Sequence, residues 1–457
     1  SFCIFLILIS LVGISASRLN KGNNQDYILA SRSVGPVATA LSAVSTCHSG
    51  FMFIGMIGFT YVAGVSAIWL IIAWLIGDLF AWTFVYPKLR KSSEEINQIT
   101  IAGFITHTFS KPYVKKTISI LVLIFLSVYA AAQLTAGSKA LWIMLEWKHS
   151  FGIFIGAIIV VLYSFSGGIR ASIWTDVVQS IIMFCSMIGL CSVAILKIGG
   201  IFTVFDRLKQ IDPNLIQLIP TNLDFGFPLY LLAWIAFGVG VIGQPHIISR
   251  PMAIKSTANL KKAAYIYLLW YLIFSLGSIL VGLTARILLP ELITGDTELA
   301  LPILAEQLLP SIFVGGILAG IFSATISTAD SQIIACSSSI TQDLFPSLKN
   351  NYKAIKLSTL VIMAIAVLIA LFGSQSVYGL VIIGWSVFAA LLAPLVFLRC
   401  INATLTQKRV SYMLAGSFIT VVIWNHVLSL SNAINESLPG LLIAFLIYFV
   451  FFIIKKK

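Results

Sequence analysis

The chain has 457 residues, of which 59% are hydrophobic and only 10% are charged, and its formal net charge is +13. Soluble domains contain about 25% charged residues, so this composition excludes a soluble enzyme and indicates a protein of the lipid bilayer. The positive charge does not indicate a nucleic-acid partner, because the Lys and Arg residues lie in short loops between apolar runs.

Apolar runs of about 20 residues, long enough to cross a hydrocarbon core about 30 Å thick, follow one another along the chain. Hydropathy predicts about 13 transmembrane helices, at residues 1–17, 34–63, 66–86, 116–144, 151–167, 171–196, 226–249, 262–289, 311–342, 354–373, 376–399, 411–428 and 437–454. The first run could also be a signal peptide. We favour a span, because Arg18 and Lys21 follow it without a small-residue cleavage site.

Basic residues predict the orientation of these helices, because cytoplasmic loops collect Lys and Arg. With the N-terminus outside, all but six of the 29 Lys and Arg residues fall on the cytoplasmic side. The exceptions are Lys139, Lys148, Lys197, Arg207, Lys209 and Arg286. We therefore expect the N-terminus outside and the C-terminus in the cytoplasm.

Three acids lie well inside predicted spans, namely Asp78, Asp176 and Asp330, and His48 and His246 join them. A charge at the middle of a bilayer costs roughly 3 to more than 10 kcal/mol. Each of these residues therefore needs a partner, water or a function. A paired packing residue is the simpler explanation, and a role in binding is the alternative.

Small hydroxylated residues crowd one stretch of the second predicted span, LSAVSTCHSGF at residues 41–51. Ser42, Ser45, Thr46 and Ser49 precede Gly50 there, which makes a poor continuous helix. An unwound segment would present backbone carbonyls, which lipid tolerates only beside a cavity. The alternative is that these small residues only allow close helix packing.

The ninth predicted span places Ala324, Ser327, Thr328 and Ser331 on one helical face, at i, i+3, i+4 and i+7. Sodium, like other hard cations, prefers oxygen ligands. Two adjacent hydroxyls facing the carbonyls of a broken helix would give it an oxygen shell without a full charge. Alternatively, the hydroxyls bond back to carbonyls of their own preceding turn.

Four motifs resemble the sodium/solute symporter family, and most closely its sodium/proline symporter branch. They are DYILASRSVGP at 26–36, SIWTDVVQ at 172–179, GQPHIISRPMA at 243–253 and STADSQIIACSSSITQDLF at 327–345. The resemblance spans nearly the whole chain. It implies an all-α membrane protein with the leucine-transporter fold, in which two inverted five-helix repeats pack around a midplane site formed by broken helices. The repeats would be residues 34–196 and 226–399, after a first transmembrane helix and cytoplasmic loop at 1–33 and before two C-terminal transmembrane helices at 400–457.

The resemblance also implies which residues bind the ion and the solute. Sodium would take backbone carbonyls from Ser45, His48 and Ala324 and hydroxyls from Ser327 and Thr328, with Asp176 in support. Asp176 could also be paired only for packing. The solute would lie beside the ion, between the second and seventh predicted spans, lined by Thr46, Cys47, Ser49, Tyr129, Phe237, Val241, Gln244 and Pro245.

The chain departs from the proline branch at several of these positions. Proline symporters carry an aspartate where this chain has Cys47, and aromatic residues around Phe237 and Val241. These departures leave the solute open between proline, another amino acid and a related carboxylate. Asp78 and Asp330 are also unexpected, and either one could bind a second cation or a cationic group of the solute.

The prediction is therefore a sodium-coupled symporter, not an enzyme, that imports a small organic solute by alternating access through a bacterial inner membrane. Sodium is the expected coupling ion, and the solute and the lipid bilayer are the expected partners. The sequence makes no prediction of oligomeric state. An ATP-driven pump is disfavoured, because no GxxxxGK[ST] phosphate loop is present. Two alternatives remain: a solute-sensing module of a signalling protein, and a proton-coupled symporter of the same fold that uses Asp176.

Overall fold

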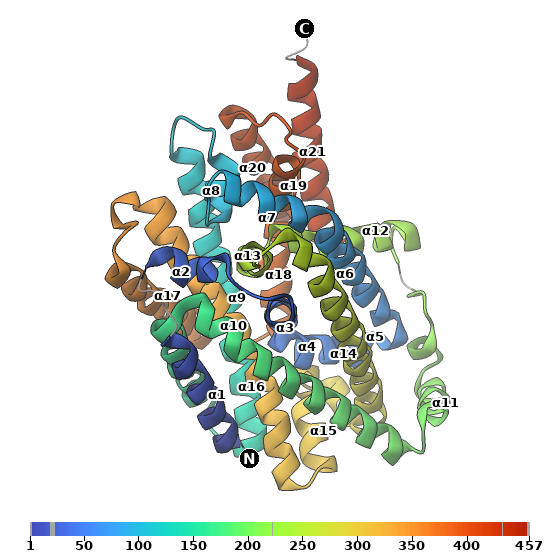
Figure 1. The fold of residues 1–457 in the computed structure, drawn as a ribbon. Coiled ribbons are helices and arrows are strands. Elements are labelled where there is room, and N and C mark those ends of the chain that lie inside the picture. Colours follow the sequence, from blue (N-terminus) through green and yellow to red (C-terminus); the bar gives the residue numbers. More distant parts are fainter. Residues whose placement is uncertain (1, 19–22, 222, 432, 455–457) are drawn as a thin grey trace.

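The structure is a computed structural model that describes residues 2–18, 23–221, 223–431 and 433–454. Across these residues it is a helical bundle without β-strands (Figure 1). The α-helices are α1 Phe2–Ser17, α2 Asn24–Leu29, α3 Pro36–Cys47, α4 Gly50–Phe53, α5 Gly55–Ala63, α6 Ile68–Phe80, α7 Tyr86–Glu95, α8 Ile101–Thr106, α9 Tyr113–Leu145, α10 His149–Ile198, α11 Ile201–Ile211, α12 Gly226–Val239, α13 Pro245–Ala253, α14 Leu260–Leu288, α15 Ala300–Leu308, α16 Ser311–Ser339, α17 Tyr352–Phe372, α18 Val377–Leu391, α19 Ala393–Cys400, α20 Gln407–Val422 and α21 Ser437–Ile454.

The apolar helices coincide with the predicted spans. Within the described residues, 9 helices are long and apolar enough to cross a membrane. Shorter apolar helices of 10–17 residues cover Phe2–Ala16, Pro36–Cys47, His149–Leu162 and Ser437–Phe451. The start of α1 and the end of α21 lie at opposite ends of the molecule (Figure 1). An odd number of membrane crossings requires that arrangement.

The second predicted span is broken. α3 ends at Cys47, His48 and Ser49 are not helical, and α4 begins at Gly50. The hydroxyl of Ser49 accepts a hydrogen bond from the backbone N–H of Phe51 (3.2 Å), so it caps the new helix instead of continuing the old one. The unwound segment predicted from the hydroxyl-rich stretch is therefore confirmed, at residues 48–49.

The seventh predicted span, 226–249, is broken in the same way. α12 tightens into a 3₁₀ turn at Gly240–Gly243, Gln244 is extended, and α13 begins at Pro245. Proline lacks an N–H and suits the first position of a helix, which explains why the new helix starts there. α13 continues to Ala253, beyond the predicted end of the span.

The fifth and sixth predicted spans are separated by a bend at a single glycine. Both lie in α10, which changes direction at Gly168 (φ 57°). A Cβ atom at this position would lie 2.6 Å from the carbonyl oxygen of Tyr27. Only glycine combines that conformation with so close a contact.

Five shorter helices, α2, α7, α8, α11 and α15, occupy segments that hydropathy left as loops. They are short or polar, so a search for apolar runs misses them. α7, for example, carries the sequence YPKLRKSSEE, and a 2.7 Å ion pair between Arg90 and Glu94 stabilises it at i,i+4 spacing.

Close helix packing brings the two broken helices together, because α13 packs directly against α3. α16 packs against both α9 and α10, and α6 packs against α12. A Cβ atom on Gly77 of α6 would lie 2.2 Å from the carbonyl of Gly238, and one on Gly238 would lie 2.1 Å from the carbonyl oxygen of Ala73. The backbones of α6 and α12 therefore touch, which fixes the second break beside the core of the bundle.

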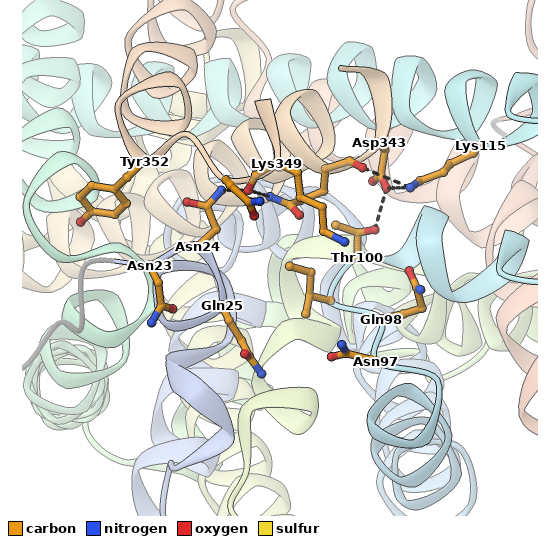
Figure 2. Close-up of a pocket in the computed structure, with 13 residues that line it drawn as sticks. Asn23, Asn24, Gln25, Asn97, Gln98, Thr100, Lys115, Asp343, Lys349 and Tyr352 are labelled. Carbon is orange, nitrogen blue, oxygen red and sulfur yellow. Dashed lines mark hydrogen bonds and ion pairs between the residues drawn. The ribbon is translucent and has the colours of Figure 1, made fainter. Parts of the chain in front are cut away.

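The face that we predicted to be cytoplasmic is tied together by polar contacts. Arg32 donates hydrogen bonds to Ser93 Oγ (3.1 Å), to the carbonyl of Met252 (3.0 Å) and to that of Gln98 (2.9 Å). A cavity of about 390 Å³ opens nearby, lined mainly by carboxamide side chains (Figure 2). At its edge Asp343 contacts Lys115 (2.9 Å) and Thr100 (3.0 Å), which holds α8 and α9 to the end of the ninth span.

Candidate sodium and solute site

The hydroxyls of the ninth span face the broken helix. Thr328 Oγ1 donates to the carbonyl of Thr46 (2.9 Å), and Ser45 Oγ donates to Ser327 Oγ (2.9 Å). Ser331 Oγ donates back to the carbonyl of Ser327 in its own helix (2.7 Å), and it also lies 3.3 Å from Thr46 Oγ1. Ser327 and Thr328 therefore point across to α3, as a site between these helices requires.

The oxygens at this crossing fit a hard monovalent cation. Because α3 ends at Cys47, carbonyls of its last turn lack the amide partners of a continuing helix. The side-chain and carbonyl oxygens at the crossing of the two helices are uncharged, and Ser45, Ala324 and Thr328 are fully buried. The His48 ring is engaged elsewhere: it contacts the Val44 carbonyl (2.9 Å) and packs among aromatic rings of α14. The Nδ1 atom of His48 is therefore already hydrogen-bonded within α3.

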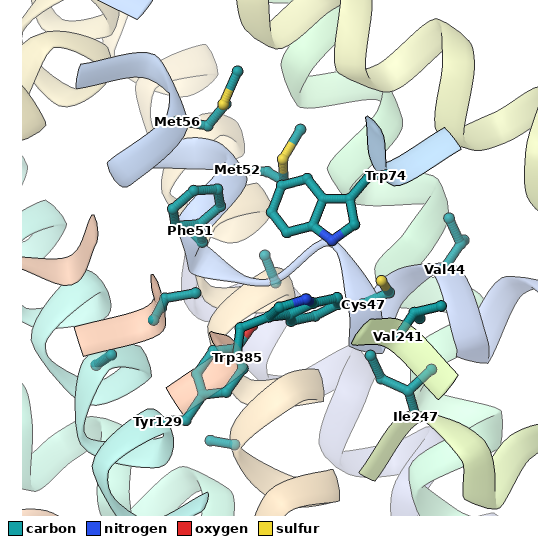
Figure 3. Packing of buried hydrophobic residues seen from close by; sticks show 14 of the residues in the cluster. Val44, Cys47, Phe51, Met52, Met56, Trp74, Tyr129, Val241, Ile247 and Trp385 are labelled. Carbon is teal, nitrogen blue, oxygen red and sulfur yellow. The ribbon is translucent and has the colours of Figure 1, made fainter. Parts of the chain in front are cut away.

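The predicted solute-lining residues meet around the two breaks. Tyr129 packs edge-on against His246 (ring centroids 5.5 Å apart), and Phe237 stacks on Trp385 (5.7 Å). Figure 3 shows Cys47, Val241, Tyr129 and Trp385 gathered together, with Trp74 next to them. All eight predicted lining residues are buried: Thr46, Cys47, Ser49, Tyr129, Phe237, Val241, Gln244 and Pro245.

Comparison with known proteins identifies the family of the chain. Residues 27–423 match the family described as the sodium:solute symporter family.

The chain belongs to the sodium:solute symporter family.

Relatives support this assignment over the full length. The symporter is 31% identical to a high-affinity proline transporter of Bacillus subtilis (strain 168), over 92% of this chain and 90% of the relative. It is 30% identical to an osmoregulated proline transporter of the same organism, over 100% and 94%. A sodium/proline symporter of Staphylococcus aureus (strain JH9) is 32% identical, over 99% and 91%.

Solved structures show the same fold. A sodium-coupled sialic acid symporter in a substrate-bound, outward-open state matches with a TM-score of 0.83 and 18% identity, over 98% of this chain and 95% of that one. A nucleobase-cation-symport-1 family transporter in a closed conformation matches with a TM-score of 0.59 and 16% identity, over 92% of both chains. As a member of the sodium:solute symporter family, the chain is an integral membrane protein that couples solute transport to sodium.

Asp176 and Arg250 form a buried ion pair next to the residues that we predicted to bind sodium. Asp176 Oδ2 accepts from Ser42 Oγ (2.6 Å) and lies 3.3 Å from Arg250 Nη2. Arg250 also donates to Ser172 Oγ (3.1 Å), to the His246 carbonyl (2.8 Å) and to Ser331 Oγ. Asp176 therefore has the paired environment that we weighed as an alternative to a supporting role. Its partner Arg250 also contacts Ser331, a residue of the predicted hydroxyl ladder on the ninth span.

Sequence reasoning missed several residues of the site. It left Arg250 in a loop, because the predicted span ended at 249, whereas only 1% of the residue is exposed. It did not select Gln133, whose side-chain oxygen accepts from the N–H of Gly50 (2.9 Å), or Trp385, whose carbonyl accepts from Gln244 Nε2 (3.2 Å). His246 was recognised as an intramembrane residue but given no role. The signal for Arg250 was present, since it lies in the GQPHIISRPMA motif.

Proposed function

We propose that this symporter imports a small zwitterionic amino acid, with proline as the first candidate, together with sodium. Unpaired polar groups at the two helix breaks carry the proposal. Within the described residues, Gln244 Oε1, Gln133 Nε2 and both ring nitrogens of His246 are buried and have no hydrogen-bond partner. Such groups are costly when left unpaired, so they favour a ligand that pairs with them.

The chemistry of these groups matches an amino acid. A carboxamide oxygen accepts from an ammonium group, and a carboxamide N–H donates to a carboxylate. The rings of Tyr129 and Trp385 provide an apolar surface for an aliphatic ring or chain. The names of the three relatives above, all proline transporters, support the same class of solute. Cys47, in place of the aspartate of the proline branch, remains the main reason to test other amino acids and small carboxylates.

Ion and solute would be coupled through the broken second span. In the proposal, sodium is bound by the carbonyls of Ser45, His48 and Ala324 and by the hydroxyls of Ser327 and Thr328, with Asp176 in support. Thr46, Cys47 and Ser49 belong to the same short segment and line the solute pocket. An ion that orders residues 45–49 therefore also prepares the solute pocket, and alternating access then carries both across.

The available driving force is sufficient for accumulation. One charge moving through 100 mV contributes about 2.3 kcal/mol, and a tenfold sodium gradient adds about 1.4 kcal/mol. Their sum corresponds to a solute gradient of about 500-fold per sodium ion.

We further propose the membrane arrangement expected from the sequence. All 13 spans cross a bacterial plasma membrane, with the N-terminus outside and the C-terminus in the cytoplasm. Residues 34–196 and 226–399 form the two inverted repeats, between the segments 1–33 and 400–457. The equivalent breaks at residues 48–49 and at Gln244 support this division, because each opens one repeat.

Uptake into proteoliposomes tests the proposal. Labelled L-proline should accumulate under an inward sodium gradient, and unlabelled amino acids should compete for it. Gln244→Leu should raise the solute concentration for half-maximal uptake, whereas sodium should still stabilise the variant thermally. Full uptake under a proton gradient without sodium would favour the proton-coupled alternative. A chain that binds solute without transporting it would favour the sensor.

A further inference from the structure

His149, the first residue of α10, is hydrogen-bonded through both ring nitrogens, at the face that we predicted to be outside. Nδ1 lies 2.6 Å from Ser138 Oγ of α9, and Nε2 lies 2.6 Å from Gln375 Oε1, at the corner between α17 and α18. Neither the sodium site nor the solute pocket described above uses this residue. The ring is only partly buried, so protons from the surrounding medium can reach it.

The surrounding hydrogen bonds determine which atoms carry protons. The single hydroxyl hydrogen of Ser138 is donated to the backbone carbonyl of His149 (2.5 Å), so Ser138 Oγ accepts from Nδ1–H. The Gln375 amide is also oriented by its neighbours, because its Nε2 donates to the carbonyls of Ala370 (3.1 Å) and Gly373 (3.3 Å). Gln375 Oε1 therefore accepts from Nε2–H. A histidine that donates from both nitrogens is a positively charged imidazolium.

The corner that His149 holds is also bound to an ion-pair cluster at the same face. Ser376 donates to Glu298 Oε1 (3.2 Å), and Glu298 Oε1 also accepts from the backbone N–H of Tyr378 (2.8 Å). Glu298 is in turn paired with Lys139 (2.7 Å). The corner is thus fastened at two points, and the one at His149 depends on a proton that imidazoles exchange near neutral pH.

This corner carries an aromatic ring toward the solute pocket. A cavity of about 480 Å³ opens at this face, and Gln375 and Tyr378 are among its lining residues. The Tyr378 ring stacks on Phe59 (ring centroids 5.2 Å apart) and on Phe51 (5.6 Å). Phe51 lies in α4, directly after the break at residues 48–49. Tyr378 therefore lies between the outer cavity and the broken second span, and a shift of the corner moves it.

We propose that His149 is a proton-binding site that controls access to the solute pocket from outside. Whichever nitrogen loses the proton, the ring and its neighbours can no longer keep all three contacts of 2.5–2.6 Å, because one of them becomes a contact between two lone pairs. Proton binding therefore favours the arrangement seen here, with Tyr378 stacked on Phe51, and proton loss favours its release. The inference rests on the proposed position of the solute pocket and adds a regulation by external pH.

The charges around His149 place the switch at mildly acidic pH. Partial burial lowers the pKa of His149, the hydrogen bond to Gln375 opposes this, and the Lys139 ammonium adds to it. Carboxylates, amines and phenols ordinarily titrate outside the range of about pH 5.5–8, so a proton exchanged in this range belongs to the imidazole. The titratable groups on the elements around it are Glu146, Lys148, Lys139, Asp296, Glu298 and Tyr378.

Nitrogen NMR of the full chain, labelled with ¹⁵N-histidine in lipid nanodiscs, tests the protonation directly. Both ring nitrogens of His149 should carry protons at about pH 5, and one proton should leave as the pH rises to about 8. His149→Asn identifies the signal by its loss. Gln375→Leu removes an acceptor of the charged ring, so it should lower the pH of half-protonation by about one unit. It also covers the case in which His149→Asn fails to fold.

Access is measured without any solute, as the rate at which an impermeant methanethiosulfonate cation added outside modifies Cys47, read by mass spectrometry. At about pH 5.5 the wild type should react about 2- to 10-fold more slowly than His149→Asn, the value of one hydrogen bond. At about pH 8 the two rates should be equal, because the wild-type ring is then neutral. His426→Asn is the control, since this exposed histidine lies on the same predicted face, and it should match the wild type at both pH values.

Two results would overturn the inference. In the first, the NMR signals show a neutral His149 at every pH from about 5 to 8. In the second, the ratio of the Cys47 reaction rates between wild type and a folded His149→Asn variant is the same at both pH values. Because neither measurement uses a solute, a failure to transport proline would count against the proposed function and leave this inference to be decided separately.

Discussion

Removing a hydroxyl of the ninth span should weaken sodium binding in proportion to its contact with the ion. In Ser327→Ala and Thr328→Ala one oxygen of the proposed shell is lost, and the helix is otherwise unchanged, since alanine is a strong helix former. Both hydroxyls face α3 at 2.9 Å, toward Ser45 and the carbonyl of Thr46. Neither position is exposed to lipid.

The expected magnitude follows from the strength of a polar contact to a charged group. Such a contact is worth about 1.5–3 kcal/mol, and every 1.4 kcal/mol is tenfold in affinity, so either change should raise the sodium midpoint about 10- to 150-fold. Ser327→Ala should fall at the lower end. The Ser45 hydroxyl can still donate to Met183 Sδ (3.4 Å), whereas in Thr328→Ala the Thr46 carbonyl loses the hydroxyl donor.

The assay is the sodium concentration that gives half-maximal thermal stabilisation of the purified protein, which reports binding without transport. Ser338→Ala is the matched control, because this buried hydroxyl of the same helix bonds only to its own backbone, at Ile334 (2.7 Å). The control should keep the wild-type midpoint. If Ser327→Ala and Thr328→Ala also keep it, the ion does not bind at this crossing.

Two further changes test the packing around the site. Arg250→Gln should lower the free energy of unfolding by about 3–5 kcal/mol, because it leaves the buried Asp176 carboxylate without its counter-charge. Adding Asp176→Asn should restore part of the melting temperature, and a double variant no more stable than the single one would contradict this pairing. Gly238→Ala should cost about 1–3 kcal/mol by pushing α12 away from Ala73, whereas Gly189→Ala, with open space at its Cβ, should leave the melting temperature unchanged or higher.

The spans could be predicted because a bilayer imposes one requirement that sequence displays directly, a long apolar run. The first break could also be predicted, since Ser45, Thr46 and Ser49 compete for backbone groups and Gly50 follows them. The residue at which the second broken helix ends could not be predicted. Pro245 restarts the helix, and α13 then carries Arg250 into the protein, where a hydropathy window sees only a loop cation.

The residues of the candidate site likewise fall into those that could be predicted from the sequence and those that could not. Ser327 and Thr328 were found because helical spacing alone places them on one face. Gln133 and Trp385 were not, because their importance depends on partners far away in sequence: Gly50 for the first and Gln244 for the second. Carboxamides and indoles carry no charge, so nothing marks them in an apolar segment until the helices are packed.

The pairing of Asp176 with Arg250 also bears on how sodium leaves. An unpaired carboxylate in a low-dielectric site attracts a cation strongly and would slow its release. Arg250 already balances the charge of Asp176, so the proposed crossing presents uncharged oxygens and no net negative charge. Affinity there depends on a few dipoles that move apart when the broken helix shifts.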